Sequence, residues 1–211
     1  TKESMAASLF QADHVKAKGT FVPWTFGTAF APESVPQPED LIGTGAHGTV
    51  YKCSNDSKAC IKASRVGETL HIQRELKALK ALNVNKCENI PWLLWVGQLK
   101  YDIRNVTAVV PAFAISPLGK SLRKLPGEAR HAQQMNKHIQ AALAFAHYRK
   151  VFHLDVRLDN IIYDTNAGVF VLIDWSSATC NGEKVVGFRG SLAFAHAFIH
   201  GKENTVEWSP K

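Results

Sequence analysis

One stretch of ten residues, VFHLDVRLDN at positions 151–160, constrains the fold more than any other part of the sequence. It contains His153, Asp155 and Asn160 in the spacing H-x-D-x-x-x-x-N. Two short strand patterns, IIYD and VFVLID, follow around the turn sequence TNAG, and Asp174 ends the second one. Carboxylate and amide oxygens are typical ligands of Mg²⁺. The spacing therefore predicts a metal-dependent site built where a loop and a strand end.

The order of the other patterns indicates the fold class. The segments 41–53 and 58–64 predict two strands joined by a turn at SNDS, and PWLLWVGQL and VTAVVPAFAI predict two buried strands. Apolar residues recur at helical spacing in 68–82 and again in 126–150, which predicts two helices. A strand-rich first half with one helix, followed by a helical second half, predicts an α+β protein of two lobes with a cleft between them.

A glycine-rich loop lies in the first predicted strand. The sequence GTGAHGTV fits the pattern G-x-G-x-x-G-x-V, and a plain hairpin is the alternative interpretation of this pattern alone. Glycines allow backbone N–H groups to approach phosphate oxygens without interference from a Cβ. The β-branched residues that follow favour a strand, whereas a dinucleotide-binding loop is followed by a helix. The candidate nucleotide-binding residues of this segment are Gly43, Thr44, Gly45, Ala46, His47, Gly48 and Val50.

Lys62 lies at the end of the next strand pattern, ACIK, where a cation can pair with the α- and β-phosphates of a nucleotide. A surface lysine at a strand end is the alternative. Glu75 is the best candidate to orient Lys62, because it lies beside the apolar face of its helix and has no Lys or Arg four residues later. Glu68 is the second choice.

The polar residues of the loop suggest a division of roles. Asp155 would orient an attacking hydroxyl or accept its proton, and Arg157 would place a cation near a transferred phosphoryl group. Asn160 and Asp174 would hold Mg²⁺. Each acid alone is more often a turn-forming residue. Five elements in the correct order, each on the predicted type of structure, are much less common by chance.

From about Leu41 to Ile199 these motifs resemble the protein-kinase-like superfamily. The resemblance implies a two-lobed protein-kinase-like α+β fold with a β-rich N-lobe, a strongly reduced helical C-lobe, and ATP and Mg²⁺ as cofactors. We expect an N-terminal extension at 1–40, with a secretion or targeting segment as one interpretation of it, the N-lobe and hinge at 41–119, and a minimal C-lobe at 120–211.

The same resemblance assigns an adenine site. It implies that Cys60 and Ile162 enclose the adenine ring, and that Ile115 is the gatekeeper residue before the hinge. The hinge segment itself, Ser116 to Leu118, would then offer backbone groups to the adenine.

Three departures concern regulation and substrate binding. Leu154 stands where protein kinases usually carry the Arg that meets an activation-loop phosphate, the D-F-G position reads DWS, and no A-P-E motif follows. We therefore expect a kinase that does not need activation-loop phosphorylation. FRGSLAFAHA resembles the segment that receives the substrate in Ser/Thr kinases, with Ser191 in place of its Thr.

The chain length, the HLD loop and the shortened activation segment make the sequence similar to the HopBF family of bacterial type III secreted effectors. That resemblance implies secretion into the cytoplasm of a eukaryotic host cell. It also implies a protein substrate, the host chaperone HSP90, phosphorylated on Ser or Thr. We expect the chain to act as a monomer.

A small-molecule phosphotransferase of the aminoglycoside or choline kinase type is the main alternative, because those enzymes share H-x-D-x-x-x-x-N and often IDW. The glycine loop and ACIK favour a protein kinase instead. A non-catalytic pseudokinase is disfavoured, since every phosphate- and metal-handling residue is present. The formal net charge is +7, but no basic run is interleaved with aromatic residues, so we expect no nucleic-acid partner. No apolar run approaches the length that crosses a bilayer, so we expect no membrane partner.

Overall fold

The computed structural model describes residues 21–23, 40–45, 48–54, 56–103, 106–122, 129–180, 183, 185–186, 189–190 and 207–208. The chain divides into two compact units. The first comprises Thr1–Gln73 and Trp92–Leu118, and the second comprises Arg74–Pro91 and Gly119–Lys211. The assignment of Arg74–Pro91 to the second unit is not indicated by any sequence pattern.

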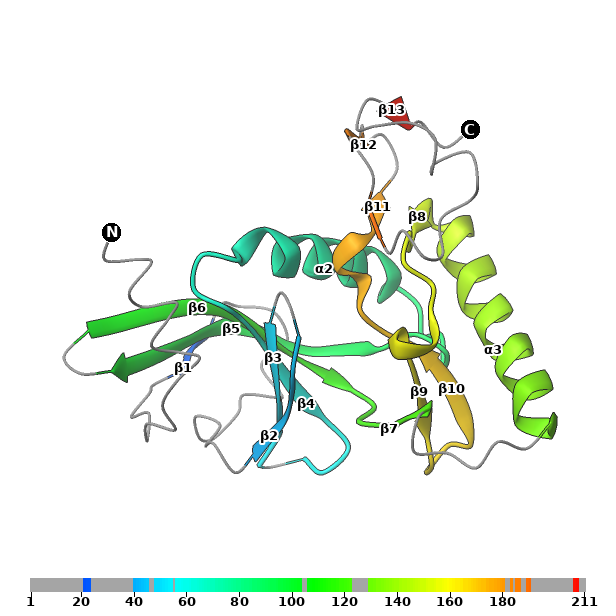
Figure 1. Ribbon diagram of the computed structural model, residues 1–211, viewed down its shortest axis with the longest axis horizontal. Coiled ribbons are helices and arrows are strands. Elements are labelled where there is room, and N and C mark those ends of the chain that lie inside the picture. Colours follow the sequence, from blue (N-terminus) through cyan, green and yellow to red (C-terminus); the bar gives the residue numbers. More distant parts are fainter. Residues whose placement is uncertain are drawn as a thin grey trace. The chain divides into compact units, whose positions relative to one another are not determined.

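The first unit is built on a six-stranded antiparallel sheet with the strand order β1-β5-β6-β4-β3-β2 (Figure 1). Its strands are β1 (Phe21–Pro23), β2 (Leu41–Thr44), β3 (Gly48–Lys52), β4 (Cys60–Ser64), β5 (Trp92–Ile103) and β6 (Val106–Ser116). The predicted strands at 58–64, 91–99 and 106–115 are confirmed. The prediction of one strand over 41–53 is wrong, because the glycine loop divides this segment into β2 and β3, which pair with each other. β1, from the expected N-terminal extension, pairs with β5.

The two faces of this sheet carry different side chains. Residues directly opposite each other on neighbouring strands project to the same face. Val50 lies opposite Lys62, and Lys62 lies opposite Phe113, so these three side chains share one face. The other face holds the hydrophobic core of the unit, formed by Tyr51, Cys53, Ala59, Ile61, Ala63, Trp95, Leu99, Val110, Ala112 and Ala114.

Trp95 requires a glycine two positions later on its strand. Trp95 and Gly97 lie on the same face of β5 because side chains alternate along a strand. A Cβ at Gly97 would overlap the indole ring of Trp95. Glycine therefore lets the largest side chain of the core lie flat against the strand.

The predicted helix at 68–82 is confirmed as α2 (Thr69–Leu82), which begins in the first unit and ends in the second. Its buried side chains include Ile72, Leu79 and Leu82, which follow the helical repeat. Glu75 lies within this buried stripe and its side chain is only 1% exposed. A carboxyl group at that depth requires polar or cationic neighbours to be tolerated.

The second predicted helix is confirmed as α3 (Ala129–Tyr148), which packs against the hairpin strand β10 (Val169–Leu172) (Figure 1). His138 Nδ1 on α3 accepts a hydrogen bond of 3.0 Å from the backbone N–H of Phe170. Gln134 Nε2, one turn earlier, donates to the carbonyl of Gly168 at 2.8 Å. Side chains of the helix thereby satisfy backbone groups at the start of the strand.

The remaining strands of the second unit form small sheets around the segment 151–180. They are β7 (Lys120–Ser121), β8 (Val151–Phe152), β9 (Ile161–Asp164), β11 (Thr179–Cys180), β12 (Val185–Val186) and β13 (Glu207–Trp208). The sheets are β10-β9-β7, β11-β8 and β12-β13. The predicted hairpin around TNAG is confirmed as β9 and β10. No helix in the described part of the chain is both long and apolar enough to cross a membrane.

Candidate active site

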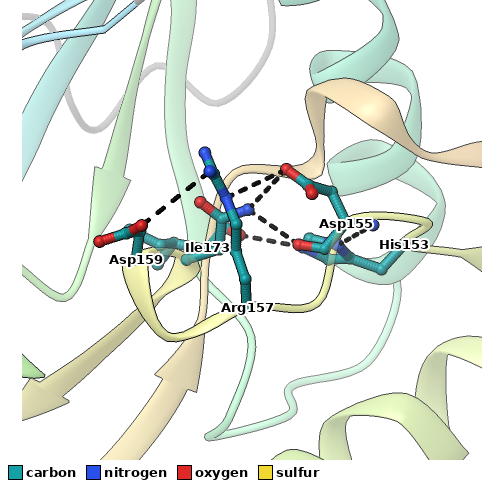
Figure 2. A network of polar contacts seen from close by, with 6 residues as sticks. His153, Asp155, Arg157, Asp159 and Ile173 are labelled. Carbon is teal, nitrogen blue, oxygen red and sulfur yellow. Dashed lines mark hydrogen bonds and ion pairs between the residues drawn. The ribbon is translucent and has the colours of Figure 1, made fainter. Parts of the chain in front are cut away.

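His153 connects the loop of the second unit to the segment before Asp174 (Figure 2). Its ring is buried, with 1% of the residue exposed. Nε2 lies 2.9 Å from the carbonyl oxygen of Ile173, and Nδ1 lies 3.2 Å from the backbone nitrogen of Asp155. A carbonyl oxygen only accepts and a backbone N–H only donates, so His153 is the neutral tautomer with its hydrogen on Nε2.

Asn160 fixes both the backbone and the carboxylate of Asp155. Its side-chain nitrogen donates to the Asp155 carbonyl at 2.8 Å and to Asp155 Oδ2 at 3.0 Å. The backbone carbonyl of Asn160 in turn accepts from the N–H of Ile173 at 2.8 Å. An amide group has two N–H donors. Its side-chain oxygen, Oδ1, is therefore the atom of Asn160 that can serve as a metal ligand.

Arg157 lies between two carboxylates of the same loop, as Figure 2 shows. Its Nε is 3.4 Å from Asp155 Oδ2, and its Nη1 is 3.9 Å from Asp159 Oδ2. Asn160 and Arg157 therefore approach the same oxygen of Asp155. The carboxylate is held in one orientation by a hydrogen bond and a cation together.

The backbone is strained on both sides of this arrangement. Leu154 and Asp174 have φ angles of 64° and 61°, in the left-handed region that costs about 1–3 kcal/mol for residues other than glycine. Trp175 follows Asp174 and is fully buried, with its ring centroid 4.5 Å from that of His153 and its Nε1 donating to the Leu172 carbonyl at 3.0 Å. Strain of this kind persists only where surrounding contacts fix it, and it is typical of functional sites.

Gly190 lies directly against the loop that carries Leu154 and Asp155. Its φ is +103°, and a Cβ there would overlap the carbonyl oxygen of Leu154 and lie 3.6 Å from the Cα of Asp155. The preceding Arg189 donates from Nη1 to the carbonyl of Ala178 at 3.3 Å. Only glycine fits this contact. Ser191, expected to take the place of the Thr in the substrate-receiving segment, lies outside the described residues.

In the first unit, one face of the sheet carries Lys62 together with two of the expected nucleotide-binding residues. Cys60 lies two positions before Lys62 on β4 and therefore on the same face, and Val50 lies opposite Lys62. A Cβ at Gly48 would come within 2.8 Å of the Ala63 carbonyl oxygen, so glycine is required for strand pairing at this point.

The glycine loop shows where backbone groups are available. Among the described residues other than the chain neighbours, no heavy atom lies within 4 Å of where a Cβ on Gly43 would be, and only the Gly48 carbonyl lies near Gly45. Thr44 is exposed at the end of β2. The N–H of Gly45 donates to the Gly48 carbonyl at 2.9 Å, so this amide closes the turn instead of facing a ligand. Ala46 and His47 lie outside the described residues.

The expected hinge lies where the chain leaves the first unit, since that unit ends at Leu118. Ile115 is buried near the end of β6. The N–H of Leu118 donates to the Lys58 carbonyl at 2.6 Å, and Ser116 Oγ donates to the same oxygen at 3.2 Å. Leu118 can therefore offer its carbonyl to an adenine, but its N–H is already used.

Ile162 is on β9 in the second unit, where it pairs with Ser121 of β7. A Cβ at Gly119 would come within 2.9 Å of Ile162 Cδ1 and of the Tyr163 carbonyl oxygen. The absence of a side chain at Gly119 lets the chain enter the second unit in contact with Ile162.

A magnesium ion fits the donors of the second unit. No group of three or more His, Cys, Asp or Glu side chains could hold a metal ion among the residues that the structure describes. Mg²⁺ does not need such a group, because it binds through one or two protein oxygens together with phosphates and water. Asn160 Oδ1 and the carboxylate of Asp174 are donors of the required kind.

Sequence reasoning missed several residues of this site. It named His153 only as part of the motif and gave it no role of its own, although the motif itself indicated that this side chain has a defined position. It gave no role to Trp175 or Gly190. The glycine just before Ser191 was a weak signal, since it carries meaning only once the contact with Leu154 is known.

The comparisons with known proteins agree with this geometry. The family model described as protein kinase domain matches residues 37–196. The CTD kinase subunit alpha of Schizosaccharomyces pombe is 28% identical over 144 residues, which cover 64% of this chain and 23% of that protein. A probable serine/threonine-protein kinase WNK9 of Oryza sativa subsp. japonica is 23% identical over 169 residues, which cover 74% of this chain and 40% of that protein. The chain thus spans less than half the length of these two relatives.

Proposed function

Because the chain belongs to the protein kinase domain family, we propose that it transfers the γ-phosphoryl group of ATP to a serine or threonine hydroxyl of a protein. One observation supports this most directly. Asp155 is held by the His153 ring, by the Asn160 amide and by the Arg157 cation within one short loop. Phosphoryl transfer needs accurate positioning more than covalent chemistry from the protein.

Asp155 is the proposed residue that orients the attacking hydroxyl. Asn160 and Arg157 both approach Oδ2. That arrangement turns the carboxylate so that Oδ1 can accept the hydrogen of the substrate hydroxyl. Arg157 is proposed to stabilise negative charge that develops on the transferred phosphoryl group.

The nucleotide and metal are assigned to residues of the described units. Lys62 and the glycine loop would bind the phosphates, while Val50 and Cys60, on the same sheet face as Lys62, would contact the adenine. Asn160 Oδ1 and the Asp174 carboxylate would hold Mg²⁺. When bound, Mg²⁺ neutralises part of the charge on the phosphates. Glu75 is proposed to orient Lys62, in keeping with its burial.

The decisive experiment compares Asp155→Ala with Asp159→Ala. Both remove a carboxylate that lies near Arg157, but only Asp155 is bound by Asn160. We expect Asp155→Ala to abolish the transfer of label from γ-labelled ATP with Mg²⁺ to a protein mixture, and Asp159→Ala to retain most of it. Thermal unfolding of both variants controls for folding. Equal transfer by wild type and Asp155→Ala would refute the catalytic assignment.

The same assay separates the two substrate classes. Parallel reactions contain proteins, aminoglycosides or choline as acceptors. Phosphoamino-acid analysis of the labelled protein tests the proposed serine/threonine specificity. Both relatives are named as kinases, and one of them as a probable serine/threonine-protein kinase. Label that enters only small molecules would overturn the protein kinase proposal.

The resemblance to the HopBF family supports a narrower proposal: the chain acts as a monomer in the cytoplasm of a host cell, with HSP90 as its substrate. Phosphoproteomics of a eukaryotic lysate exposed to wild type and to Asp155→Ala tests this substrate. A dominant Asp155-dependent site on HSP90 would support the narrower proposal, and its absence would remove it without affecting the kinase assignment. Light scattering coupled to size-exclusion chromatography tests the monomer.

A further inference from the structure

Glu183 makes an unusual number of contacts for a residue outside the proposed catalytic set. Its Oε1 pairs with Lys77 Nζ of α2. Its Oε2 accepts from the Thr179 hydroxyl at 3.1 Å and from the Cys180 backbone N–H at 3.0 Å. All these residues belong to the second unit. One carboxylate therefore connects α2 to the segment that follows Asp174.

Lys77 contacts this carboxylate, and the charge of the carboxylate also acts on Arg74. Arg74 precedes Lys77 by one turn of α2, so both lie on the same side of the helix. Burial lowers the pKa of Arg74, the charge of Arg189 lowers it further, and the charge of Glu183 raises it. Glu183 thus pairs with Lys77 and offsets part of the effect that the charge of Arg189 has on Arg74.

Glu183 is charged at neutral pH. Burial acts to raise its pKa, but the hydrogen bonds to its carboxylate and the charge of Lys77 outweigh burial and lower the pKa below its usual value. The pKa of Lys77 is raised, chiefly by its hydrogen bond to Glu183. The pair is therefore fully ionised across the neutral range.

The segment that Glu183 holds is continuous with the proposed active site. β11, which contains Thr179 and Cys180, pairs with β8, and β8 ends one residue before His153. On the helix side, Lys77 lies two positions after the buried Glu75, so a contact at Lys77 fixes the rotation of the helix that carries Glu75.

We propose that Glu183 is a positioning residue for phosphotransfer: its carboxylate holds α2 and the segment after Asp174 together, so that the chain needs no phosphate added to that segment. This inference rests on the proposed kinase function. It also accounts for Leu154, because a chain whose segment is held by its own carboxylate does not need a cation at position 154 to meet a phosphate.

The expected effect is moderate. Lys77 is 59% exposed and Glu183 is 29% exposed, and exposed ion pairs contribute little by themselves. The two hydrogen bonds to Oε2 add to the pair because they are assisted by charge. We expect Glu183→Gln, which keeps the shape of the side chain and removes its charge, to lower kcat by about three- to tenfold.

The first experiment measures phosphotransfer by the full chain. Lys77→Glu should lower kcat as Glu183→Gln does, and the exchanged pair Lys77→Glu with Glu183→Lys should recover part of the loss. Glu88→Gln is the matched control, since it removes the same charge from an exposed position of the second unit. Wild-type kcat in Glu183→Gln would overturn the proposal, as would an equal loss in Glu88→Gln.

The second experiment measures amide hydrogen exchange over 74–82 and 179–180. Glu183→Gln should accelerate exchange in both segments, and Glu88→Gln in neither. If wild type transfers no phosphate, the proposed function fails, and hydrogen exchange still decides the structural part of the inference. Unchanged exchange together with an active wild type would overturn the role of Glu183 alone.

The third experiment tests independence from phosphorylation. Protein treated with phosphatase and shown by mass spectrometry to carry no phosphate should start transferring label at the full rate, without a lag. A lag that disappears as phosphate accumulates on the chain would show that an added phosphate is needed, and would overturn the proposal.

Discussion

Replacing Gly190 by alanine should reduce phosphotransfer more than it reduces stability. The added methyl group would overlap the carbonyl oxygen of Leu154, which is a backbone atom and cannot rotate away. Leu154 already has a φ of 64°. The least costly response is therefore a shift of the loop that carries Leu154 and Asp155, or a shift of residues 189–190. Either shift changes how Asp155 and residues 189–190 lie relative to each other.

The expected effect of Gly190→Ala has two parts, a loss of folding free energy and a loss of rate, and a control variant can separate them. A residue other than glycine at a φ of +103° costs about 1–3 kcal/mol of folding free energy. Gly168 has a φ of +70°, and among the described residues outside its own chain neighbours its Cβ would meet only the Tyr163 hydroxyl, at 3.8 Å. Gly168→Ala therefore incurs a conformational cost of the same kind without a collision near Asp155. Misplacement of a catalytic group by about 1 Å can cost about a hundredfold in rate.

The assay combines urea unfolding with initial rates of label transfer from γ-labelled ATP. We expect both variants to lose stability, but only Gly190→Ala to lose one to two orders of magnitude in kcat, by the same positioning argument. Rates are compared at a temperature where both variants are fully folded. Wild-type kcat in folded Gly190→Ala would refute the claim that Gly190 helps to fix Asp155.

Two further predictions concern stability. Gly97→Ala should destabilise the first unit by about 1–3 kcal/mol in urea unfolding, because its methyl group would overlap the Trp95 indole. Gly43→Ala, where the described residues leave open space, should have a much smaller effect. Equal effects of the two substitutions would contradict the packing argument. Burial lowers the pKa of His138 below its usual 6.5, and its Nδ1 accepts from the Phe170 N–H. The stability that neutral His138 contributes is therefore complete above pH 6.5 and is lost as the pH falls through the lowered pKa. His138→Asn, which retains an acceptor but does not titrate, should lose less unfolding free energy between pH 7.5 and 5.5 than wild type does.

The features that the sequence predicted well are those marked by a regular pattern of residues close together in the chain. The α2 and α3 helices follow apolar residues at helical spacing, and the β9–β10 hairpin follows a turn sequence between two apolar runs. The burial of Glu75 was also indicated locally, because this residue sits next to the apolar face of its helix.

The features that sequence did not predict depend on contacts between distant backbone groups. β1 is three residues long, too short to show a pattern, and its backbone pairs with that of β5, far along the chain. The N–H of Leu118 is engaged by the Lys58 carbonyl, sixty residues earlier in the chain. Backbone hydrogen bonds of this kind do not depend on side-chain identity, so they leave no signal in the sequence.

The link between His153 and Ile173 also has a consequence for how the chain folds. It closes a loop of only twenty residues, whereas β1 and β5 pair across more than seventy. Closing a shorter loop costs less chain entropy, and local contacts form faster. We therefore expect the segment 151–175 to gain protection before the edge of the large sheet does, an order that pulse-labelled amide exchange during refolding can measure. The residues proposed for chemistry would then also be among the first to become ordered.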